Sequence, residues 1–502
     1  MHAEVNSIAR DVARKQGIPV IKLWPAQGEE AGLFSLEGEK CGVTACKGYA
    51  QPDDIALLLH TSGTTSRPKL VPLTQKNLCC SAHNIQKVLC LVESDRCLNV
   101  MPLFHIHGLI AGVLSSLGSG GSVVCAPGFQ APHFFAWIET FRPTWYTAVP
   151  TIHQAVLTRY ASGQESLTHR SLRFIRSSSS ALPPKAMAEL ENVFGVPVIE
   201  AYGMTEASHQ IASNPLPPKK RKVGSVGMAA GPEVAVMDEK GNLLSPENTG
   251  EIVIRGLNVI HSYEEDASIN EKSFSNGWFR TGDQGFIDSD GYLFLTGRIK
   301  EIINRGGEKI SPREIDEILM DHPAVAQAVT FSLPHDKLGE EVAAAVVLRA
   351  DGSITERELR EFVSTRVAPY KVPRHIVFLD AIPKGPTGKF QRIGLAKTLG
   401  ITLEEEQSKV PFVEPHTSMQ VVLAGIWSQV LGLEKIGIND NYFELGGDSI
   451  LATQIITRIK QRLRVDLSIL TFFEEPTIAR LALALSKNQG GEAQKGPNGH
   501  SL

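Results

Sequence analysis

The chain has 502 residues, with 50 lysines and arginines against 54 aspartates and glutamates and a formal net charge of −4. Its length predicts several domains, and its near-neutral balance gives no electrostatic reason to expect a nucleic-acid or membrane partner. The seven cysteines lack CxxC spacing. They support neither a zinc site nor a disulfide framework, and we expect a cytoplasmic protein.

Short apolar runs alternate with helical stretches from the N-terminus to about Thr296, as in IALLLHTSG, TWYTAVP and LRFIRSS. Apolar strands separated by amphipathic helices predict an α/β large subdomain over residues 1–298. From Val234 onward the pattern changes to short strands with glycine-containing turns, which predicts a part of this subdomain rich in β-hairpins.

Four segments follow the large subdomain. Residues 299–400 predict a small α+β subdomain, because helices such as PREIDEILMDH accompany the strand EVAAAVVLR. Residues 401–417 are charged and broken by proline, as is typical of a linker. Residues 418–486 predict an all-α four-helix bundle with one apolar helical face, and the polar, glycine-rich residues 487–502 predict a disordered tail.

A loop rich in hydroxyl groups follows the strand IALLLH and reads Thr61-Ser-Gly-Thr-Thr-Ser-Arg-Pro-Lys69. Glycine, hydroxyls and lysine at the end of a strand offer many donors for triphosphate oxygens. The spacing of a Walker A loop is absent. Taken by itself, the segment fits a polar surface loop about equally well.

Four further motifs follow the loop, in the order Tyr202-Gly-Met-Thr-Glu206, Thr281-Gly-Asp283, Gly297-Arg-Ile-Lys300 and Gly385-Pro-Thr-Gly-Lys389. With the loop, they resemble the motifs of the adenylate-forming superfamily, which contains acyl-CoA synthetases, luciferases and the adenylation domains of peptide synthetases. Five motifs in one order over most of the chain make this resemblance very specific. The loop departs from the family at positions 66 and 70, where serine and leucine replace the usual glycines. A serine hydroxyl can still donate to phosphate, so we expect ATP binding to persist.

The resemblance implies a role for each motif. Lys389 is the catalytic lysine, Thr205 contacts phosphate, Glu206 holds Mg²⁺ and Asp283 binds both ribose hydroxyls. The residues expected to bind ATP or AMP are Thr61, Ser62, Gly63, Thr64, Thr65, Lys69, Tyr202, Asp283 and Arg298.

The chemistry explains why these groups are needed. Attack of a carboxylate on the α-phosphate of ATP forms a mixed anhydride and expels pyrophosphate. Two anions approach each other, so Mg²⁺ on Glu206 and the ammonium of Lys389 would supply positive charge. A thiol then attacks the acyl adenylate. By resemblance, the small subdomain rotates about the hinge residue Lys300 for this step, and the thiol tunnel is lined by Gly306, Gly307 and Glu308.

The string Asp440-Asn-Tyr-Phe-Glu-Leu-Gly-Gly-Asp-Ser449 precedes the helical segment ILATQIITRIK. A serine at a helix start can be a simple N-cap, but the longer string resembles the phosphopantetheine attachment site of peptidyl and acyl carrier proteins. This resemblance implies that a separate phosphopantetheinyl transferase attaches 4′-phosphopantetheine to Ser449. A downstream synthetase or transferase module would then be a partner.

Amino-acid-activating relatives usually bind the substrate ammonium with an aspartate in the segment that here reads MPLFHIHG, residues 101–108. This segment has histidines and no carboxylate, so an α-amino acid is disfavoured. Hydroxyl and imidazole donors suit a small dianion, and the motifs look most like the oxalate–CoA ligase group. Such donors also suit hydroxy acids or small aromatic acids. The expected pocket residues are His107, which we also expect to act in catalysis, Ser178, Ser179, Ser180 and His209.

Two features stand outside this scheme. The basic run PKKRKV over residues 218–223 has the pattern of a nuclear localisation signal, but its place inside the adenylation fold favours a solvated surface loop.

The superfamily also has many more residues before the phosphate loop than precede Thr61 here. We therefore expect the chain to lack the N-terminal part of the fold and to expose sheet edges and apolar surface.

We expect an AMP-forming acid–thiol ligase that adenylates a small polar or dicarboxylic acid and loads it onto Ser449 of the same chain. The fused carrier segment departs from a simple ligase and leaves two alternatives. One is an acyl-CoA ligase that uses free CoA as acceptor. The other is an inactive, truncated chain that serves only as a carrier or interaction module.

Overall fold

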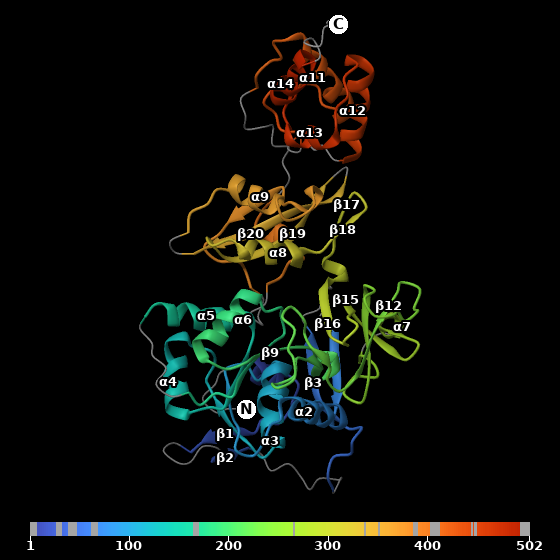
Figure 1. Ribbon diagram of the computed structural model, residues 1–502. Helices are drawn as coiled ribbons and strands as arrows, with labels where there is room; N and C mark the ends of the chain where they lie inside the picture. Colours follow the sequence, from blue (N-terminus) through green and yellow to red (C-terminus); the bar gives the residue numbers. More distant parts are fainter. Residues whose placement is uncertain are drawn as a thin grey trace, which may run out of the picture. The chain divides into compact units, whose positions relative to one another are not determined.

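The computed structural model describes residues 8–26, 33–38, 48–61, 69–163, 170–264, 267–335, 338–349, 352–384, 390–401, 412–442, 445 and 449–491 (Figure 1). The chain divides into two compact units, Met1–Asp54 and Ile55–Leu502. The first unit contains helix α1 (Ile8–Lys15) and the antiparallel strands β1 (Lys22–Pro25) and β2 (Phe34–Glu37). Its apolar side chains, Phe34 and Leu36 among them, are largely exposed.

A seven-stranded sheet in the order β11-β10-β9-β8-β7-β5-β6 forms the centre of the second unit. Strands β5 to β9 pair in parallel, and β10 and β11 add an antiparallel edge. The strands are β5 (Arg96–Asn99), β6 (Ser122–Cys125), β7 (Trp145–Ala148), β8 (Phe174–Ser178), β9 (Val198–Met204), β10 (His209–Ser213) and β11 (Met228–Ala229). The segments that surround them are α2 (Gln75–Leu89), the π-helix η1 (His107–Leu114), α3 (Ser115–Gly118), α4 (Ala131–Phe141), α5 (Pro150–Ala161), α6 (Pro184–Phe194) and the 3₁₀ turn η2 (Thr205–Ala207).

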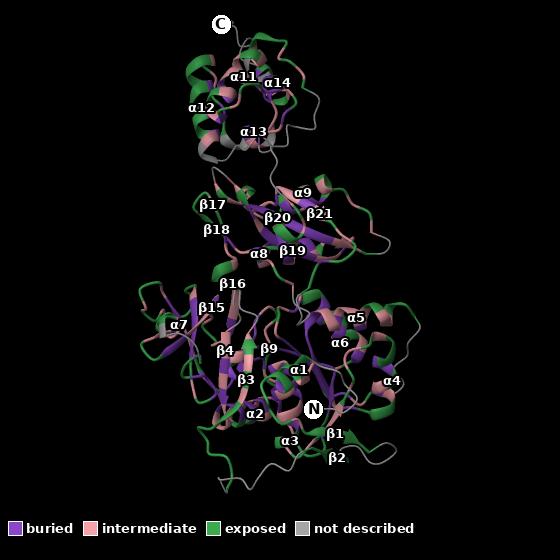
Figure 2. Cartoon of the chain, turned by 180° about the vertical axis from the view of Figure 1, so that it is seen from behind, coloured by how far each residue is buried: buried purple, intermediate pink, exposed green. Residues whose placement is uncertain are grey.

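Both faces of this sheet are buried, as the purple central strands of Figure 2 show. Trp145 and Phe174 share an apolar cluster with Ile85 of α2, whereas the next residues, Tyr146 and Ile175, pack with α4, α5 and α6. Successive side chains of a strand point to opposite faces, and a parallel sheet is covered on both. The carboxyl ends of β7, β8 and β9 therefore meet at one edge, where α/β folds place their ligands.

Smaller sheets precede and follow the central one. Strands β3 (Ile55–Thr61) and β4 (Lys69–Thr74) form an antiparallel pair. A second antiparallel sheet has the order β12-β13-β15-β14, with β16 paired to β15. Its members are β12 (Glu233–Met237), β13 (Gly250–Arg255), β14 (Phe274–Ser275), β15 (Trp278–Ile287) and β16 (Leu293–Arg298), with helix α7 (Ala267–Ser273) between β13 and β14.

The α+β segment after Arg298 is built on a sheet in the order β18-β17-β20-β19, to which β21 adds in parallel. Its faces belong to two different apolar clusters, because alternate residues of β20 such as Val342 and Ala343 point to opposite sides. The elements are η3 (Ile299–Glu301), β17 (Ile303–Arg305), β18 (Glu308–Ile310), α8 (Pro312–Asp321), β19 (Val325–His335), β20 (Gly339–Leu348), α9 (Glu356–Ser364), η4 (Pro369–Lys371), β21 (His375–Phe378) and α10 (Leu395–Thr398).

The last segment is a bundle of four helices, α11 (Ser418–Leu431), α12 (Ser449–Leu463), α13 (Ile469–Glu474) and α14 (Ile478–Gly491). In its core, Tyr442 meets Trp427 and Phe472 edge to face, with ring centroids 5.3 and 4.8 Å apart, and Trp427 lies tilted against Phe472 at 5.7 Å. Such pairs add to the area that the rings bury. The bundle thus has an apolar cluster of its own.

The predicted fold class is confirmed, with an α/β part, a small α+β part and a helical bundle. One boundary differs from the expected one. Residues 487–491, which we assigned to the tail, continue helix α14, because no helix breaker occurs before the glycine pair at its end. Residues 402–411 of the expected linker and 492–502 of the expected tail lie outside the described residues. Among the helices that the structure describes, none has both the length and the apolar character needed to cross a bilayer.

Candidate active site

Three of the predicted motifs meet around the carboxylate of Asp283. Its Oδ2 accepts a hydrogen bond of 2.5 Å from the Tyr202 hydroxyl, and its Oδ1 accepts one of 3.0 Å from Nε of Arg298. Tyr202 lies on β9, whereas Asp283 and Arg298 face each other in the register of β15 and β16. The charge of Asp283 raises the pKa of Arg298. Burial, followed by the nearby Asp283 charge, raises the pKa of Tyr202.

Glu206 lies in turn η2, directly after β9, and only 7% of its surface is exposed. Its Oε1 accepts a hydrogen bond of 2.8 Å from the Tyr263 hydroxyl. The Lys69 ammonium lies 4.3 Å from the centre of the Tyr263 ring. Burial raises the pKa of Glu206, against the lowering effects of Tyr263, Lys69 and Arg298. The last residue of the predicted phosphate loop and the predicted magnesium ligand therefore share one neighbour, Tyr263, which no motif had marked.

The donor set around Glu206 is compatible with Mg²⁺ that is bound mainly through nucleotide phosphates. No cluster of three or more histidine, cysteine, aspartate or glutamate side chains suited to a metal occurs in the part of the chain that the structure describes. Mg²⁺ commonly takes one or two carboxylates and completes its shell with water and substrate phosphates. The buried oxygens of Glu206 fit such a role, in which the protein supplies few ligands.

A cluster of imidazole and hydroxyl groups forms at the carboxyl ends of β7 and β8. His107, the first residue of π-helix η1, is fully buried. Its Nε2 lies 2.6 Å from the Thr147 hydroxyl and its Nδ1 lies 3.1 Å from that of Ser179. The His209 ring stacks on the His107 ring, with centroids 4.9 Å apart. Of the predicted pocket residues, the structure thus brings together His107, Ser179 and His209, and it adds Thr147.

The backbone around this cluster takes conformations that L-residues seldom adopt. Ser179, Ser208 and His209 have φ of 75°, 50° and 91°. Non-glycine residues in this region are strained and concentrate at functional sites. A Cβ on Gly203 would lie 1.6 Å from the carbonyl oxygen of His209. The close approach of β9 and β10 that places the His209 ring therefore requires glycine at position 203.

Two of the predicted pocket serines do not join the cluster. The Ser178 hydroxyl is fully buried and donates to the Ala201 carbonyl on the neighbouring strand at 2.9 Å. Ser180 is exposed beyond the end of β8. Neighbouring side chains of a strand point in opposite directions, and the left-handed backbone at Ser179 changes direction again. For this reason only the middle serine faces His107.

The remaining predicted residues are placed as follows. Thr61 ends β3 and pairs in register with Lys69 at the start of β4. Thr205 is half-buried in η2, and Lys300 is exposed in η3. Gly306 and Gly307 have φ of 59° and 97° in the turn between β17 and β18, and Glu308 begins β18. Residues that lie outside the described part are Ser62, Gly63, Thr64, Thr65 and Lys389, while Ser449 is described only by its backbone, as the first residue of α12.

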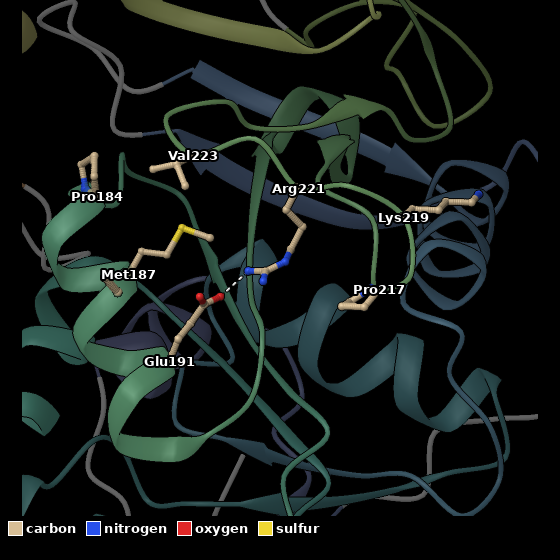
Figure 3. Close-up of a pocket in the computed structure, with 8 residues that line it drawn as sticks. Pro184, Met187, Glu191, Pro217, Lys219, Arg221 and Val223 are labelled. Atoms are coloured by element: carbon tan, nitrogen blue, oxygen red, sulfur yellow. Dashed lines mark hydrogen bonds and ion pairs between the residues drawn. The ribbon is translucent and has the colours of Figure 1, made fainter.

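The basic run at residues 218–223 is held by carboxylates of the same fold. Arg221 forms an ion pair with Glu191 of α6, beside a hollow that Met187 and Val223 also line (Figure 3). Lys222 pairs with Asp288 and, at 2.7 Å, with Asp290. These contacts favour a structural surface loop over an exposed nuclear localisation signal.

Comparison with known proteins agrees with this geometry. Residues 3–264 match the model of the AMP-binding enzyme family, residues 314–389 match the C-terminal domain of that family, and residues 421–485 match the phosphopantetheine attachment site. The chain therefore belongs to the AMP-binding enzyme family, and it carries a phosphopantetheine-binding domain. It is an AMP-forming acid–thiol ligase.

Several named relatives are similar over most of the chain. An oxalate–CoA ligase of Arabidopsis thaliana is 52% identical over 393 residues, which are 78% of this chain and 76% of the relative. The oxalate–CoA ligase of Saccharomyces cerevisiae is 46% identical over 70% of this chain and 64% of its own. Among solved structures, ATP-bound MatB from Rhodopseudomonas palustris has a TM-score of 0.68 at 29% identity, covering 78% of this chain and 76% of its own.

Proposed function

We propose that the protein activates oxalate, or another small dicarboxylate, with ATP and transfers the acyl group to the thiol of free CoA. The contact of His107 with Ser179 and His209 carries this proposal. Imidazole and hydroxyl donors stabilise a second carboxylate, which would be costly to bury without partners. An alkyl chain would leave the same donors without hydrogen bonds, so these groups disfavour fatty acids.

The acceptor in this proposal differs from our first expectation, which was the arm on Ser449. The relatives at about half identity are named CoA ligases, which favours free CoA.

In the first half-reaction, Asp283 would hold the ribose, and Glu206 would hold Mg²⁺. Mg²⁺ supplies charge that stabilises the phosphates when it is bound. Lys389 would bring an ammonium to the reacting carboxylate and phosphate.

An acid panel in the pyrophosphate exchange assay tests the substrate class. We expect the highest rate with oxalate or another short diacid. His209→Ala should lower kcat/KM for oxalate roughly tenfold or more relative to acetate, because one donor to the distal carboxylate is lost. The matched control is His133→Ala, an exposed histidine beside Trp137, which should leave the ratio unchanged. A highest rate with a long-chain fatty acid or an α-amino acid would refute the assignment.

A second acceptor is favoured by one observation, the match of residues 421–485 to the phosphopantetheine attachment site. In this candidate function, a phosphopantetheinyl transferase modifies Ser449, and the acyl group passes to that arm. Intact-mass measurement of the holo protein separates the two acceptors. Acyl attachment without added CoA would support transfer to Ser449, whereas product that forms only with free CoA would support the CoA ligase. Absence of pyrophosphate exchange with every acid would instead indicate an inactive chain.

A further inference from the structure

Arg176 is a fully buried arginine in the middle of strand β8. None of the ion pairs formed by the described residues includes it, and its Nε has no hydrogen-bond partner among them. Its other contacts are to neutral oxygens, with Nη2 2.9 Å from Oε1 of Gln210 and Nη1 3.4 Å from the Thr147 hydroxyl. Burial lowers its pKa to about 9, so the guanidinium stays charged at neutral pH. A buried cation without a counter-ion is costly.

The contact between Arg176 and Thr147 affects which atoms donate and which accept in the neighbouring hydrogen bonds. Arginine has donors and no acceptor, so Nη1 donates to Oγ1 of Thr147. The one other hydrogen-bond partner of that hydroxyl among the described residues is Nε2 of His107, at 2.6 Å. Arg176 offers no acceptor, so Nε2 is the acceptor within reach of the Thr147 hydroxyl hydrogen. Thr147 is fully buried, and a buried donor without an acceptor is costly, so this hydrogen is donated to Nε2.

The same donor-to-acceptor order continues through the His107 ring. A neutral imidazole whose Nε2 accepts carries its hydrogen on Nδ1. Nδ1 of His107 then donates to the Ser179 hydroxyl at 3.1 Å. Ser179 has accepted this bond, so its own hydrogen is left to donate to a ligand, and its side chain is partly exposed.

We propose that Arg176 is a positioning residue that sets the direction of a chain of hydrogen bonds, Arg176 to Thr147 to His107 to Ser179. The hydrogen-bond chain ends in the Ser179 hydroxyl, whose hydrogen is left for an acceptor on the ligand. Such an end favours an anionic acceptor over an ammonium, which has no acceptor for that hydrogen. The ligand is the distal carboxylate of the acid, and this part of the proposal rests on the proposed function.

The tautomer of His107 tests the hydrogen-bond chain without any substrate. In the full-length protein with ¹⁵N-labelled histidine, the signals that disappear in His107→Asn identify its ring nitrogens. We expect the Nδ1–H tautomer in the wild type and in Thr147→Ser, which keeps the hydroxyl. In Thr147→Val we expect Nε2–H to become populated. Ser116→Ala removes another buried hydroxyl, bonded to the Gly112 carbonyl, and should change nothing. An Nε2–H tautomer in the wild type, or no change in Thr147→Val, would overturn the proposal.

Kinetics with two acids test the consequence for specificity. Arg176→Met and Thr147→Val should each lower kcat/KM for oxalate roughly ten- to a hundredfold relative to acetate, mainly through KM, and Thr147→Ser should restore most of the loss. Equal losses for both acids would refute a role in specificity. A wild-type enzyme that does not prefer diacids would refute the proposed function instead. The tautomer measurement would still decide whether the hydrogen-bond chain from Arg176 to Ser179 exists.

Discussion

Substitution of Tyr263 by phenylalanine isolates one hydrogen bond to the predicted magnesium ligand. The hydroxyl donates to Oε1 of Glu206 at 2.8 Å, and this bond favours the ionised carboxylate. The aromatic ring, which packs near Phe279 and beneath Lys69, is retained in Tyr263→Phe. The substitution therefore removes the donor and keeps the surrounding contacts.

The size of the effect follows from the charge of the acceptor. A hydrogen bond to a charged group contributes about 1.5–3 kcal/mol, and 1.36 kcal/mol corresponds to about one pH unit in a titration. Loss of the donor raises the pKa of Glu206, because the ionised form is destabilised. Metal binding needs the ionised form. As the pH falls, the variant should thus lose activity first, with the acidic limb of its rate profile about one to two pH units higher.

Pyrophosphate exchange measured against pH at limiting Mg²⁺, with saturating acid, gives this limb, because protonation of Glu206 then competes with metal binding. At pH values well above it the variant should retain most of its rate. Tyr292→Phe is a matched control, because Tyr292 also has a cation over its ring and donates its hydroxyl to the Lys220 carbonyl, yet it lies beside the basic run. An unchanged limb, or one moved to lower pH, in a folded Tyr263→Phe protein would refute the assigned role.

Three further substitutions test other parts of the site. Lys389→Ala should slow adenylation roughly a hundredfold or more and spare thioester formation from preformed acyl adenylate; equal loss in both steps would contradict its role. Ser449→Ala should leave pyrophosphate exchange intact and abolish pantetheinyl attachment, which intact mass detects; a variant that is still modified would show another attachment site. Asp283→Asn should raise KM for ATP roughly tenfold or more, with the KM for the acid nearly unchanged; a rise in the acid KM alone would place Asp283 elsewhere.

The order of short motifs was sufficient to predict the family, the fold class and the adenylation chemistry. Each motif expected by resemblance to bind phosphate, ribose or the thiol consists of residues that are adjacent in the sequence, as in the segment from Thr61 to Lys69. The α/β layers could likewise be predicted, because strand and helix periodicities are local properties of the chain. The acid pocket remains a prediction. Ser178, Ser179 and Ser180 were equivalent in the sequence, and of the three it is Ser179 that contacts His107 in the structure.

The tertiary structure alone placed Tyr263 against Glu206, and Thr147 between Arg176 and His107. These partners are far apart in the sequence and meet because strand register and backbone direction bring them together, which local patterns do not encode. The segment LRFIRS contains two arginines, Arg173 and Arg176, and only the structure shows that Arg176 is the buried one. Sequence thus determined the class of reaction, whereas packing decided which side chains form the imidazole and hydroxyl cluster that we propose as the acid site, since hydrogen-bond partners are chosen by proximity in space.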